Sequence, residues 1–250
     1  MGTLTVGHDS EGGLLLNGVI TSALGNLFPF ETPDGRGFPD NMNFEIAINP
    51  VTTLKDFHSK TEGLLQGIRD RGFELLLEPT IKYPDEALKH PEAYISGCNP
   101  DYSAYTQLEN KAPDFLKMDA TRSCGAHVHV GDDQLDPYNF AKWMDAFVAL
   151  PLLLKEKYNT RRSLYGGAGC LRVKPYGAEY RTLSNVWLAS PELREFVWEG
   201  THKAVEQSKK GEFTDVIPNW VDIPKSIDTH DIKTAKEAID RLYIFGITEC

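Results

Sequence analysis

The chain has 250 residues, and its 26 basic and 36 acidic side chains give a formal net charge of −10 at pH 7. It contains no run of about 18 apolar residues, which excludes a membrane-spanning helix. The acidic balance argues against non-specific binding to nucleic acid, which depends on Lys and Arg side chains that neutralise phosphates. The segment Met1–Val6 lacks the basic region and apolar stretch of a secretion signal. We therefore expect one globular domain, residues 1–250, in the cytoplasm.

Cysteine spacing supports a reducing environment. The chain has four cysteines, which are far apart and form no Cys-x-x-Cys pair: Cys98, Cys124, Cys170 and Cys250. A disulfide framework is normally denser and found in a smaller chain. We expect these side chains to pack as small hydrophobic groups.

The first third of the chain predicts strands, a loop and a helix. Asp9 and Glu11 lie two residues apart after a short apolar run. The segment Glu31–Met42 is rich in Pro, Gly and Asp, and predicts an irregular surface loop or a mobile flap over a site. In Asn43–Asn49, apolar and polar side chains alternate with the period of two that is typical of a strand. Apolar residues at helical spacing predict a helix over Thr53–Arg71, with a glycine as its stop.

The middle of the chain repeats this combination of strand and helix. Gly125–Gly131 alternates between valines on one face and two histidines on the other. An aspartate cap and a proline at the first position predict a helix from Pro137 towards Lys157, which Pro151 should kink or break. A glycine-rich segment with four basic residues follows, and Glu179–Leu183 reads as another strand.

The last part of the chain is mostly helical. A serine cap and Pro191 begin one helix, and a final helix is predicted over Ile232–Phe245. Lys210–Thr229 has little periodicity and holds two prolines. Long helices between such strands would cover their apolar face. The pattern therefore predicts an α+β fold, with helices on one side of a mainly antiparallel sheet and a polar, concave surface on the other.

The polar face collects the residues that carry chemistry. Strand alternation places glutamates, two imidazoles and an arginine on it: Glu11, Glu45, His127, His129, Glu179 and Arg181. Clustered carboxylates raise one another's pKa values, and Mg²⁺ or Mn²⁺ relieves this repulsion. Carboxylates, metal and arginine together are the components of phosphoryl transfer from a nucleotide. Taken singly, each residue also has a simpler interpretation. A histidine can be a satisfied structural residue, Glu45 can lie on a solvated face, and Glu11 can precede a Gly12-Gly13 turn.

A second feature is the basic, glycine-rich segment. Arg161, Arg162, Arg172 and Lys174 surround a glycine-rich turn in an otherwise acidic chain. Glycines let a backbone approach an anion closely, and the cations supply the opposite charge. The segment is neither a Walker A loop nor a Gly-x-Gly-x-x-Gly motif. Phosphate binding is the hypothesis, and a flexible turn is the alternative.

Five motifs in this order resemble the phage-encoded carboxylate–amine ligases, or amidoligases, of the glutamine synthetase and glutamate–cysteine ligase superfamily. The matching segments are His8–Glu11, Asp40–Pro50, Gly97–Tyr102, Gly125–Gly131 and Arg161–Asn185. They extend over roughly three quarters of the chain. The resemblance implies a curved antiparallel sheet in the shape of a half-funnel, with helices on its outer face, ATP at one mouth and Mg²⁺ or Mn²⁺ ions between.

Residue roles follow from the same resemblance. Glu11, Glu45 and Glu179 match the metal-binding glutamates, and one or both of His127 and His129 match the imidazole contributor. Arg181 matches the arginine that faces the transferred phosphate. The four basic residues of the glycine-rich segment are expected near the nucleotide phosphates.

The implied reaction is an ATP-dependent amide synthesis. ATP phosphorylates a substrate carboxylate to an acyl phosphate, and a neutral amine then displaces phosphate. Asp101 and Tyr102 are candidates for substrate binding, because a carboxylate would attract an ammonium group. A purely structural role of the Gly97–Tyr102 turn is the alternative.

Two other functions stay open at this point. The spacing of His127, His129 and Asp133 would suit a metal-dependent hydrolase or oxygenase that does not use ATP. The third possibility is a non-catalytic phage protein that binds a nucleotide or a partner. The identities of the acid and the amine cannot be read from the sequence.

Overall fold

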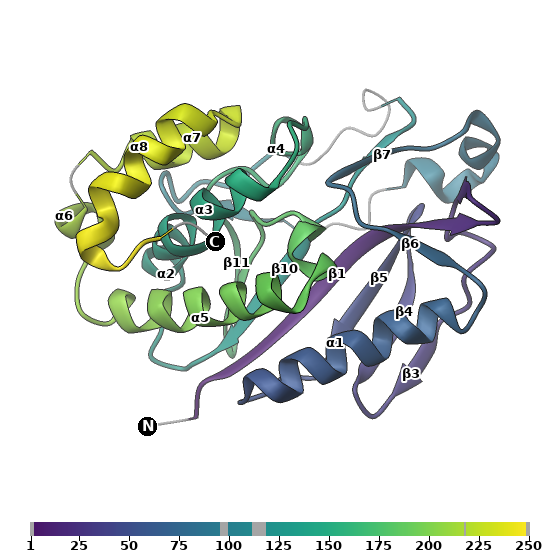
Figure 1. The fold of residues 1–250 in the computed structure, drawn as a ribbon, viewed down its shortest axis with the longest axis horizontal. Coiled ribbons are helices and arrows are strands. Elements are labelled where there is room, and N and C mark those ends of the chain that lie inside the picture. The colour runs from purple at the N-terminus through teal and green to yellow at the C-terminus, as the bar shows by residue number, and fades with distance from the viewer. Residues whose placement is uncertain (1–2, 96–99, 112–118, 218, 249–250) are drawn as a thin grey trace.

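The computed structural model describes residues 3–95, 100–111, 119–217 and 219–248 (Figure 1). Its strands are β1 (Thr5–Leu16), β2 (Val19–Thr21), β3 (Phe30–Thr32), β4 (Gly35–Asp40), β5 (Asn43–Ile48), β6 (Glu74–Leu76), β7 (Thr80–Lys82), β8 (Tyr102–Ser103), β9 (Thr121–Ser123), β10 (Ala126–Gly131), β11 (Cys170–Lys174) and β12 (Gly177–Tyr180). The α-helices are α1 (Leu54–Arg69), α2 (Pro137–Met144), α3 (Leu150–Leu152), α4 (Arg161–Leu164), α5 (Pro191–Ser208), α6 (Phe213–Val216), α7 (Asp222–Thr229) and α8 (Ile232–Leu242). A π-helical turn spans Asp145–Ala149, and 3₁₀ turns span Asp85–Lys89, Pro91–Tyr94, Leu153–Lys155, Asn185–Ala189 and Tyr243–Phe245.

The main sheet is open and antiparallel. Its strand order is β3-β4-β5-β1-β10-β12-β11-β8, with β2 and β6 paired to the far end of β1, and β7 and β9 form a separate pair. Every pairing between these strands is antiparallel. The long strand β1 lies between β5 and β10 and so connects the N-terminal strands with those near the glycine-rich segment. The predicted combination of helices with a mainly antiparallel sheet is confirmed.

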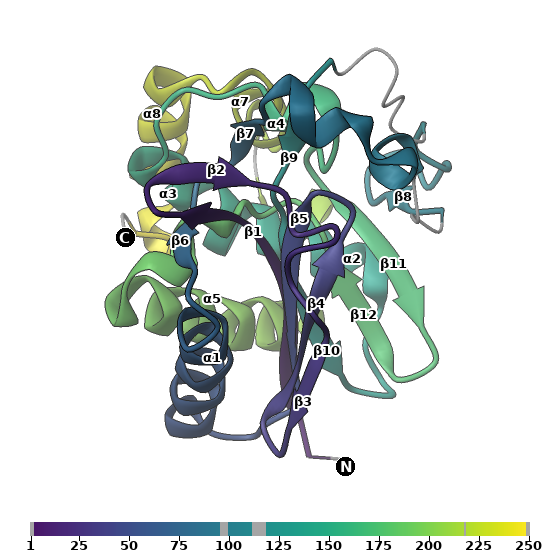
Figure 2. The same ribbon diagram turned by 90° about the vertical axis from the view of Figure 1, so that its right-hand side faces the viewer.

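Helices cover one face of this sheet. Figure 2 shows α1 and α5 on the same side of β1, β4, β5 and β10. Helix α1 begins where Thr53 Oγ1 accepts a hydrogen bond from the backbone N–H of Asp56 at 3.1 Å. Its buried side chains, which include Phe57 and Leu64, pack with Ile46 and Val128 of the sheet in one apolar core. The opposite face of the central strands carries the charged residues. None of the described helices is long and apolar enough to cross a membrane.

Helix starts and stops follow the sequence signals. Asp136 caps α2 and Ser190 caps α5, each through a side-chain oxygen that accepts backbone N–H groups. The helical run does not stop at Pro151. It passes through the π-helical turn before the proline and a 3₁₀ turn after it. Proline has no backbone N–H, and the wider π-helical turn lets the chain continue without the hydrogen bond that Pro151 cannot donate.

One local expectation was wrong, the alternative of a turn after Glu11 is excluded, and a segment with little periodicity contains helices. Glu31–Met42 is not irregular, because β3 and β4 pair as a hairpin within it. Glu11 does not precede a turn, because β1 continues through Gly12 and Gly13. At Gly12 a Cβ atom would come within 2.6 Å of the Phe44 ring, so this ring fills the space that a side chain would need. Lys210–Thr229 contains α6 and α7, although the segment lacks long periodicity.

Cys124 and Cys170 are free and buried, in agreement with the packing role that the sequence predicts. Cys98 and Cys250 lie outside the described residues.

Candidate active site

Strand register brings the predicted polar residues together. Glu11 on β1 pairs with Glu45 on β5, and Asp9 on β1 pairs with His127 on β10. On the other side of β10, His129 pairs with Glu179 on β12. The same face of four neighbouring strands therefore carries carboxylates and imidazoles that are far apart in the sequence.

Three carboxylates form what we call the acidic cluster: Glu11, Asp40 and Glu45. Each offers an oxygen within 4.8 Å of the others. One oxygen of Glu11 accepts hydrogen bonds from the backbone N–H of Gly125 at 3.2 Å and from the Asn43 amide at 3.3 Å. These contacts fix Glu11 towards its acidic neighbours.

The pKa values of the acidic cluster reflect its crowding. Burial, and then the charge of Asp40, raise the pKa of Glu11 to about 7. Burial, and then the charges of Asp9, Glu11 and Asp40, raise the pKa of Glu45 to about 10. Burial also raises the pKa of Asp40. Such a group of oxygens is the donor set that hard divalent cations prefer, and a cation would remove the mutual repulsion.

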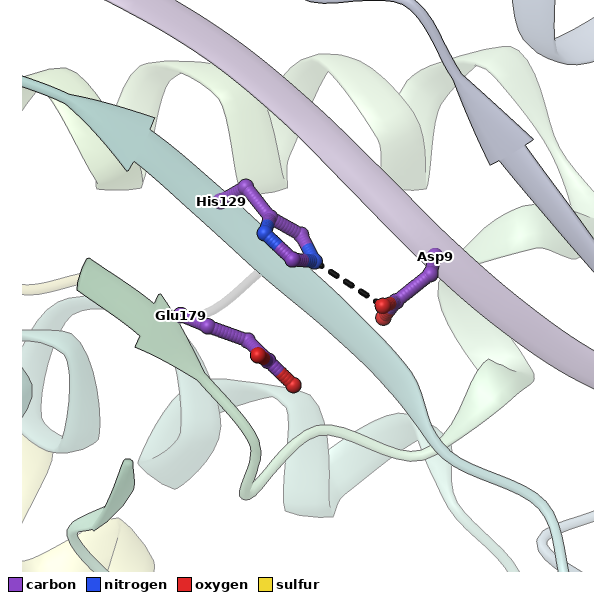
Figure 3. Close-up of side chains that lie close together, drawn as sticks. All are labelled: Asp9, His129 and Glu179. Atoms are coloured by element: carbon purple, nitrogen blue, oxygen red, sulfur yellow. Dashed lines mark ion pairs between the residues drawn. The ribbon is translucent and has the colours of Figure 1, made fainter. Parts of the chain in front are cut away.

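A second group, the mixed cluster, consists of Asp9, His129 and Glu179 (Figure 3). One ligand atom from each residue lies within 4.8 Å of the others. His129 Nε2 is 3.0 Å from an oxygen of Asp9, and the Tyr176 hydroxyl lies 2.7 Å from His129 Nδ1. A ring that donates from Nε2 to Asp9 accepts the tyrosine proton at Nδ1. Carboxylate and imidazole ligands together suit Mn²⁺ as well as Mg²⁺.

Basic side chains surround the carboxylate of Glu179. Lys174 Nζ lies 2.7 Å from its Oε2, and Arg172 Nη1 lies 3.2 Å from its Oε1. Arg181 Nη1 donates to the same Oε1. Burial by itself would raise the pKa of Glu179, but the charge of Arg181, followed by that of His127, lowers it to about 2. The sequence led us to expect raised pKa values for all clustered glutamates, and this expectation fails at Glu179.

Asp9 connects the mixed cluster with His127. Its second oxygen lies 2.9 Å from His127 Nδ1. Burial by itself would raise the pKa of Asp9, but charge interaction and hydrogen bonding with His127 and His129 hold it well below its usual range.

His127 lies in neither metal-capable group of the described residues. Burial, and then the charge of Arg181, lower its pKa to about 4, so the ring is neutral at pH 7. Its Nε2 is buried, and a Cβ atom at Gly125 would come within 2.4 Å of it. Glycine at this position therefore makes room for the ring. Asp133 is exposed and also lies outside both groups, so the described geometry gives the hydrolase or oxygenase hypothesis no complete site.

Two of the predicted phosphate-binding residues have their guanidinium groups engaged by other parts of the protein. Arg161 is fully buried, and its guanidinium donates to the backbone carbonyls of Cys124 and Thr182, at 3.2 and 2.7 Å. Arg162 forms a paired contact with Glu156, at 2.7 and 3.0 Å. Both arginines are occupied in holding loops together, and we leave them out of the proposed nucleotide site. Arg172 and Lys174 do lie beside Glu179.

The two predicted substrate-binding residues have different surroundings. Asp101 is buried, and its carboxylate accepts hydrogen bonds from the Tyr165 hydroxyl at 2.5 Å and the Asn110 amide at 2.9 Å. Tyr102 is half-buried on β8, where it pairs with Leu171. The preceding residues of this motif, 97–99, lie outside the described residues.

Sequence reasoning missed two candidate ligands. Asp9 lies two residues before Glu11, and the strand period already placed both on one face. Asp40 ends β4 and pairs with Asn43, which brings it next to Glu11 and Glu45. No sequence signal for Asp40 was available once its segment had been interpreted as a loop.

A pocket of about 390 Å³ opens beside both clusters. Asp9, Glu45 and His129 line it, together with apolar residues that include Ile48 and Pro50. Arg36 and Tyr176 also contribute to its wall. It is large enough for a small organic substrate next to the charged groups.

Comparison with known proteins gives one family match. Residues 118–216 match the model of the family described as phage phiEco32-like COOH.NH2 ligase-type 2. This segment contains His127, His129, Glu179 and Arg181, so the resemblance to phage carboxylate–amine ligases is confirmed over these strands. No match was found among the curated proteins. A solved structure titled as a GmaS complex with ADP aligns with 99% of this chain and 71% of its own, at 12% identity and a TM-score of 0.35.

Proposed function

Starting from the resemblance of residues 118–216 to the phage carboxylate–amine ligases, we propose that the chain is an ATP-dependent ligase that joins a carboxylate to an amine. The observation that carries the proposal is the convergence, on one sheet face, of the acidic cluster, the mixed cluster and Arg181. We further propose that residues 1–250 act as one ligase domain, in which the curved sheet has the half-funnel form of the glutamine synthetase superfamily.

The two clusters fit divalent cations. The acidic cluster would hold one ion through carboxylate oxygens only, and the mixed cluster would hold another through Asp9, His129 and Glu179. Both oxygens of Glu179 have basic partners, Lys174 at Oε2 and Arg172 and Arg181 at Oε1, so a bound cation would share this carboxylate with them. Bound Mg²⁺ or Mn²⁺ would supply neutralisation of the negative charge on the γ-phosphate.

The protein residues would position the nucleotide and stabilise charge. Arg172 and Lys174 are placed to meet phosphate oxygens beside the mixed cluster. Arg181, next to Glu179, would stabilise the charge that spreads over the γ-phosphoryl oxygens during transfer. A carboxylate oxygen of the substrate attacks the γ-phosphorus, and ADP leaves. The amine nitrogen then attacks the acyl carbon, phosphate leaves, and the nitrogen loses its proton.

The pocket beside the clusters would receive an organic substrate. Its wall combines apolar residues with Arg36, a cation for which the described part of the chain records no ion pair. His129 and Asp9 lie at the pocket, so a substrate bound there would have its reacting end next to the mixed cluster.

The test is a coupled measurement of ADP and product. Protein, ATP and Mg²⁺ are mixed with a panel of carboxylates and amines, and hydroxylamine is included as a general amine that converts acyl phosphates to hydroxamates. The proposal predicts ADP, phosphate and amide or hydroxamate in equal amounts. Failure to bind ATP with Mg²⁺ or with Mn²⁺ contradicts it. Tight Zn²⁺ or Fe²⁺ binding with turnover that ignores ATP would support a hydrolase or oxygenase instead.

A further inference from the structure

Arg181 is held on two sides. On one side its Nη1 donates to Glu179 and lies 3.0 Å from His127 Nδ1. On the other side its Nη2 donates to the Tyr165 hydroxyl at 2.8 Å, and its Nε lies 3.4 Å from an oxygen of Asp101. Arg181 is 3% exposed and its guanidinium is planar, so contacts at both edges fix the direction of this group as well as its position.

Tyr165 and Asp101 form a connected pair behind this guanidinium. The Tyr165 hydroxyl accepts a hydrogen bond from Arg181 and donates its own proton to Asp101 at 2.5 Å. The Tyr165 ring also lies near the guanidinium, with 5.3 Å between the Arg181 Cζ and the ring centroid. Removal of the hydroxyl would break both links and leave the ring in place.

Asp101 is anchored on its other side. Its other carboxylate oxygen accepts a hydrogen bond from the Asn110 side-chain amide at 2.9 Å. Its backbone carbonyl accepts a second hydrogen bond from the Asn110 backbone N–H, also at 2.9 Å. With 4% exposure and contacts at both oxygens, the carboxylate is directed to Arg181 and Tyr165 rather than to solvent. This arrangement favours a role through Arg181 over the ammonium-binding role predicted from the sequence.

The number of basic groups around Glu179 explains why a second carboxylate is needed to orient Arg181. Glu179 is shared among Arg172, Lys174 and Arg181, and it also belongs to the mixed cluster. A carboxylate with so many partners does not by itself fix one arginine. Asp101 is a separate carboxylate near the Nε edge of Arg181. The Nη1 edge of the same guanidinium faces Glu179 of the mixed cluster.

We propose that Tyr165 and Asp101 are positioning residues that direct Arg181 towards the transferred phosphoryl group. The assignment of the phosphoryl group rests on the proposed function; the positioning of the guanidinium rests on the contacts above. Neither residue takes part in bond making, and both act through Arg181.

The first experiment measures the guanidinium itself. Nitrogen-15 NMR follows the Nε–Hε signal of Arg181, assigned by its loss in Arg181→Lys. In the wild-type chain this proton should exchange slowly with solvent. Tyr165→Phe removes the hydrogen bond at Nη2, and Asp101→Asn removes the negative charge 3.4 Å from Nε. Each should raise the exchange rate of the Nε proton by about tenfold, which corresponds to the loss of one contact of a charged group. Tyr243→Phe, at a tyrosine that is 69% exposed, is the control and should leave the rate unchanged.

The second experiment measures ATP-dependent turnover. Tyr165→Phe should lower kcat by about tenfold or more and change KM for ATP by less than about twofold, because the interaction acts in the transition state. In an Arg181→Lys background, Tyr165→Phe should have no further effect on kcat, since its target is gone. A merely structural tyrosine would lower kcat by the same factor in both backgrounds.

The outcomes separate the two proposals. Unchanged Hε exchange in both Tyr165→Phe and Asp101→Asn overturns the positioning proposal, and so does an equal loss of kcat in the two arginine backgrounds. A wild-type chain with no ATP turnover contradicts the proposed function, and the exchange rates then decide the positioning of Arg181 without it.

Discussion

The acidic cluster and the mixed cluster lie on the same sheet face, but their electrostatics are opposite. In the acidic cluster, half-buried carboxylates face one another, and their pKa values rise to about 7 at Glu11 and about 10 at Glu45. In the mixed cluster, Glu179 is more deeply buried, but Arg181 lowers its pKa to about 2. Burial alone therefore does not decide the charge of a carboxylate; its nearest charged partner does.

This difference suggests different tasks. Among the described residues, no Lys or Arg forms an ion pair with the acidic cluster, and the cluster should depend on a metal ion for its charge balance. The mixed cluster is balanced by Arg181, Arg172 and Lys174, so it stays ionised without a metal and lies where phosphate would meet basic groups. A variant in the mixed cluster should therefore lose turnover, whereas a variant in the acidic cluster should lose metal binding.

The largest effect is expected at Glu179. Glu179→Gln removes the charge that holds Arg181 and one donor of the mixed cluster, so ATP turnover should fall by at least about 100-fold. Steady-state ADP release measures this loss. Glu195→Gln, at an exposed position on α5, is the matched control and should keep wild-type turnover. Turnover of Glu179→Gln within a few-fold of the wild-type rate would show that the mixed cluster is not the reaction centre.

A smaller and different effect is expected at Glu45. Glu45→Gln should weaken Mn²⁺ binding by about 10–100-fold, since even outer partners of metal ligands have effects of this size. Without metal and at pH 7, the same variant should be more stable than the wild type, because glutamine avoids the cost of protonating Glu45 on folding. Calorimetric titration with Mn²⁺ and a thermal melt in chelator measure the two changes. Glu31→Gln, at an exposed position on β3, is the control. Loss of stability without metal would contradict the repulsion argument.

Arg172 should affect the nucleotide more than the metal. Arg172→Gln removes one charged donor beside Glu179, and we expect about tenfold weaker ATP binding, the equivalent of one charge-assisted hydrogen bond. Isothermal titration with ATP and Mg²⁺ gives the value, with Arg241→Gln as an exposed control. An unchanged affinity would place the nucleotide phosphates elsewhere on the face.

The smallest effect is the pH dependence of stability without metal. Glu11 and Glu45 have raised pKa values in the folded chain, so their contribution is fully present below the ordinary pKa of 4.5 and is lost as the pH rises through about 7 and about 10. Glu179 has a lowered pKa, so its contribution is present above 4.5 and lost as the pH falls through about 2.

Thermal melts in chelator between pH 5 and 9 test these signs. The Tm should fall as the pH rises, by about 2–4 °C for each 1 kcal/mol of lost stability. Mg²⁺ or Mn²⁺ should reduce the fall, and Glu45→Gln should make the profile flatter. A Tm that rises over this range would contradict the raised pKa values of the acidic cluster.

Local signals in the sequence predicted much of the fold. Alternation located β5 and β10, and caps at Asp136 and Ser190 located the starts of two helices. These features depend on residues close in the chain. The hairpin of β3 and β4 was missed because turn-forming residues within it outweighed its short strands.

The sequence predicted which side of the sheet carries the site residues, but not which of these residues contact one another. The period of two placed Glu11, Glu45, His127 and Glu179 on one side of their strands, but the division into two clusters depends on which strands are neighbours. Asp40 joins the acidic cluster only through the pairing of β4 with β5. Whether a guanidinium points to a ligand or to backbone carbonyls, as at Arg161, depends on packing that no local pattern records.

The most direct test of the central claim is a crystal structure with Mn²⁺ and a non-hydrolysable ATP analogue, in which the metal is located by its anomalous scattering. The account predicts Mn²⁺ peaks at the acidic cluster and at the mixed cluster, with the γ-phosphate between Arg181 and the metal ions. A nucleotide bound away from this sheet face, with no metal peak at either cluster, would contradict it.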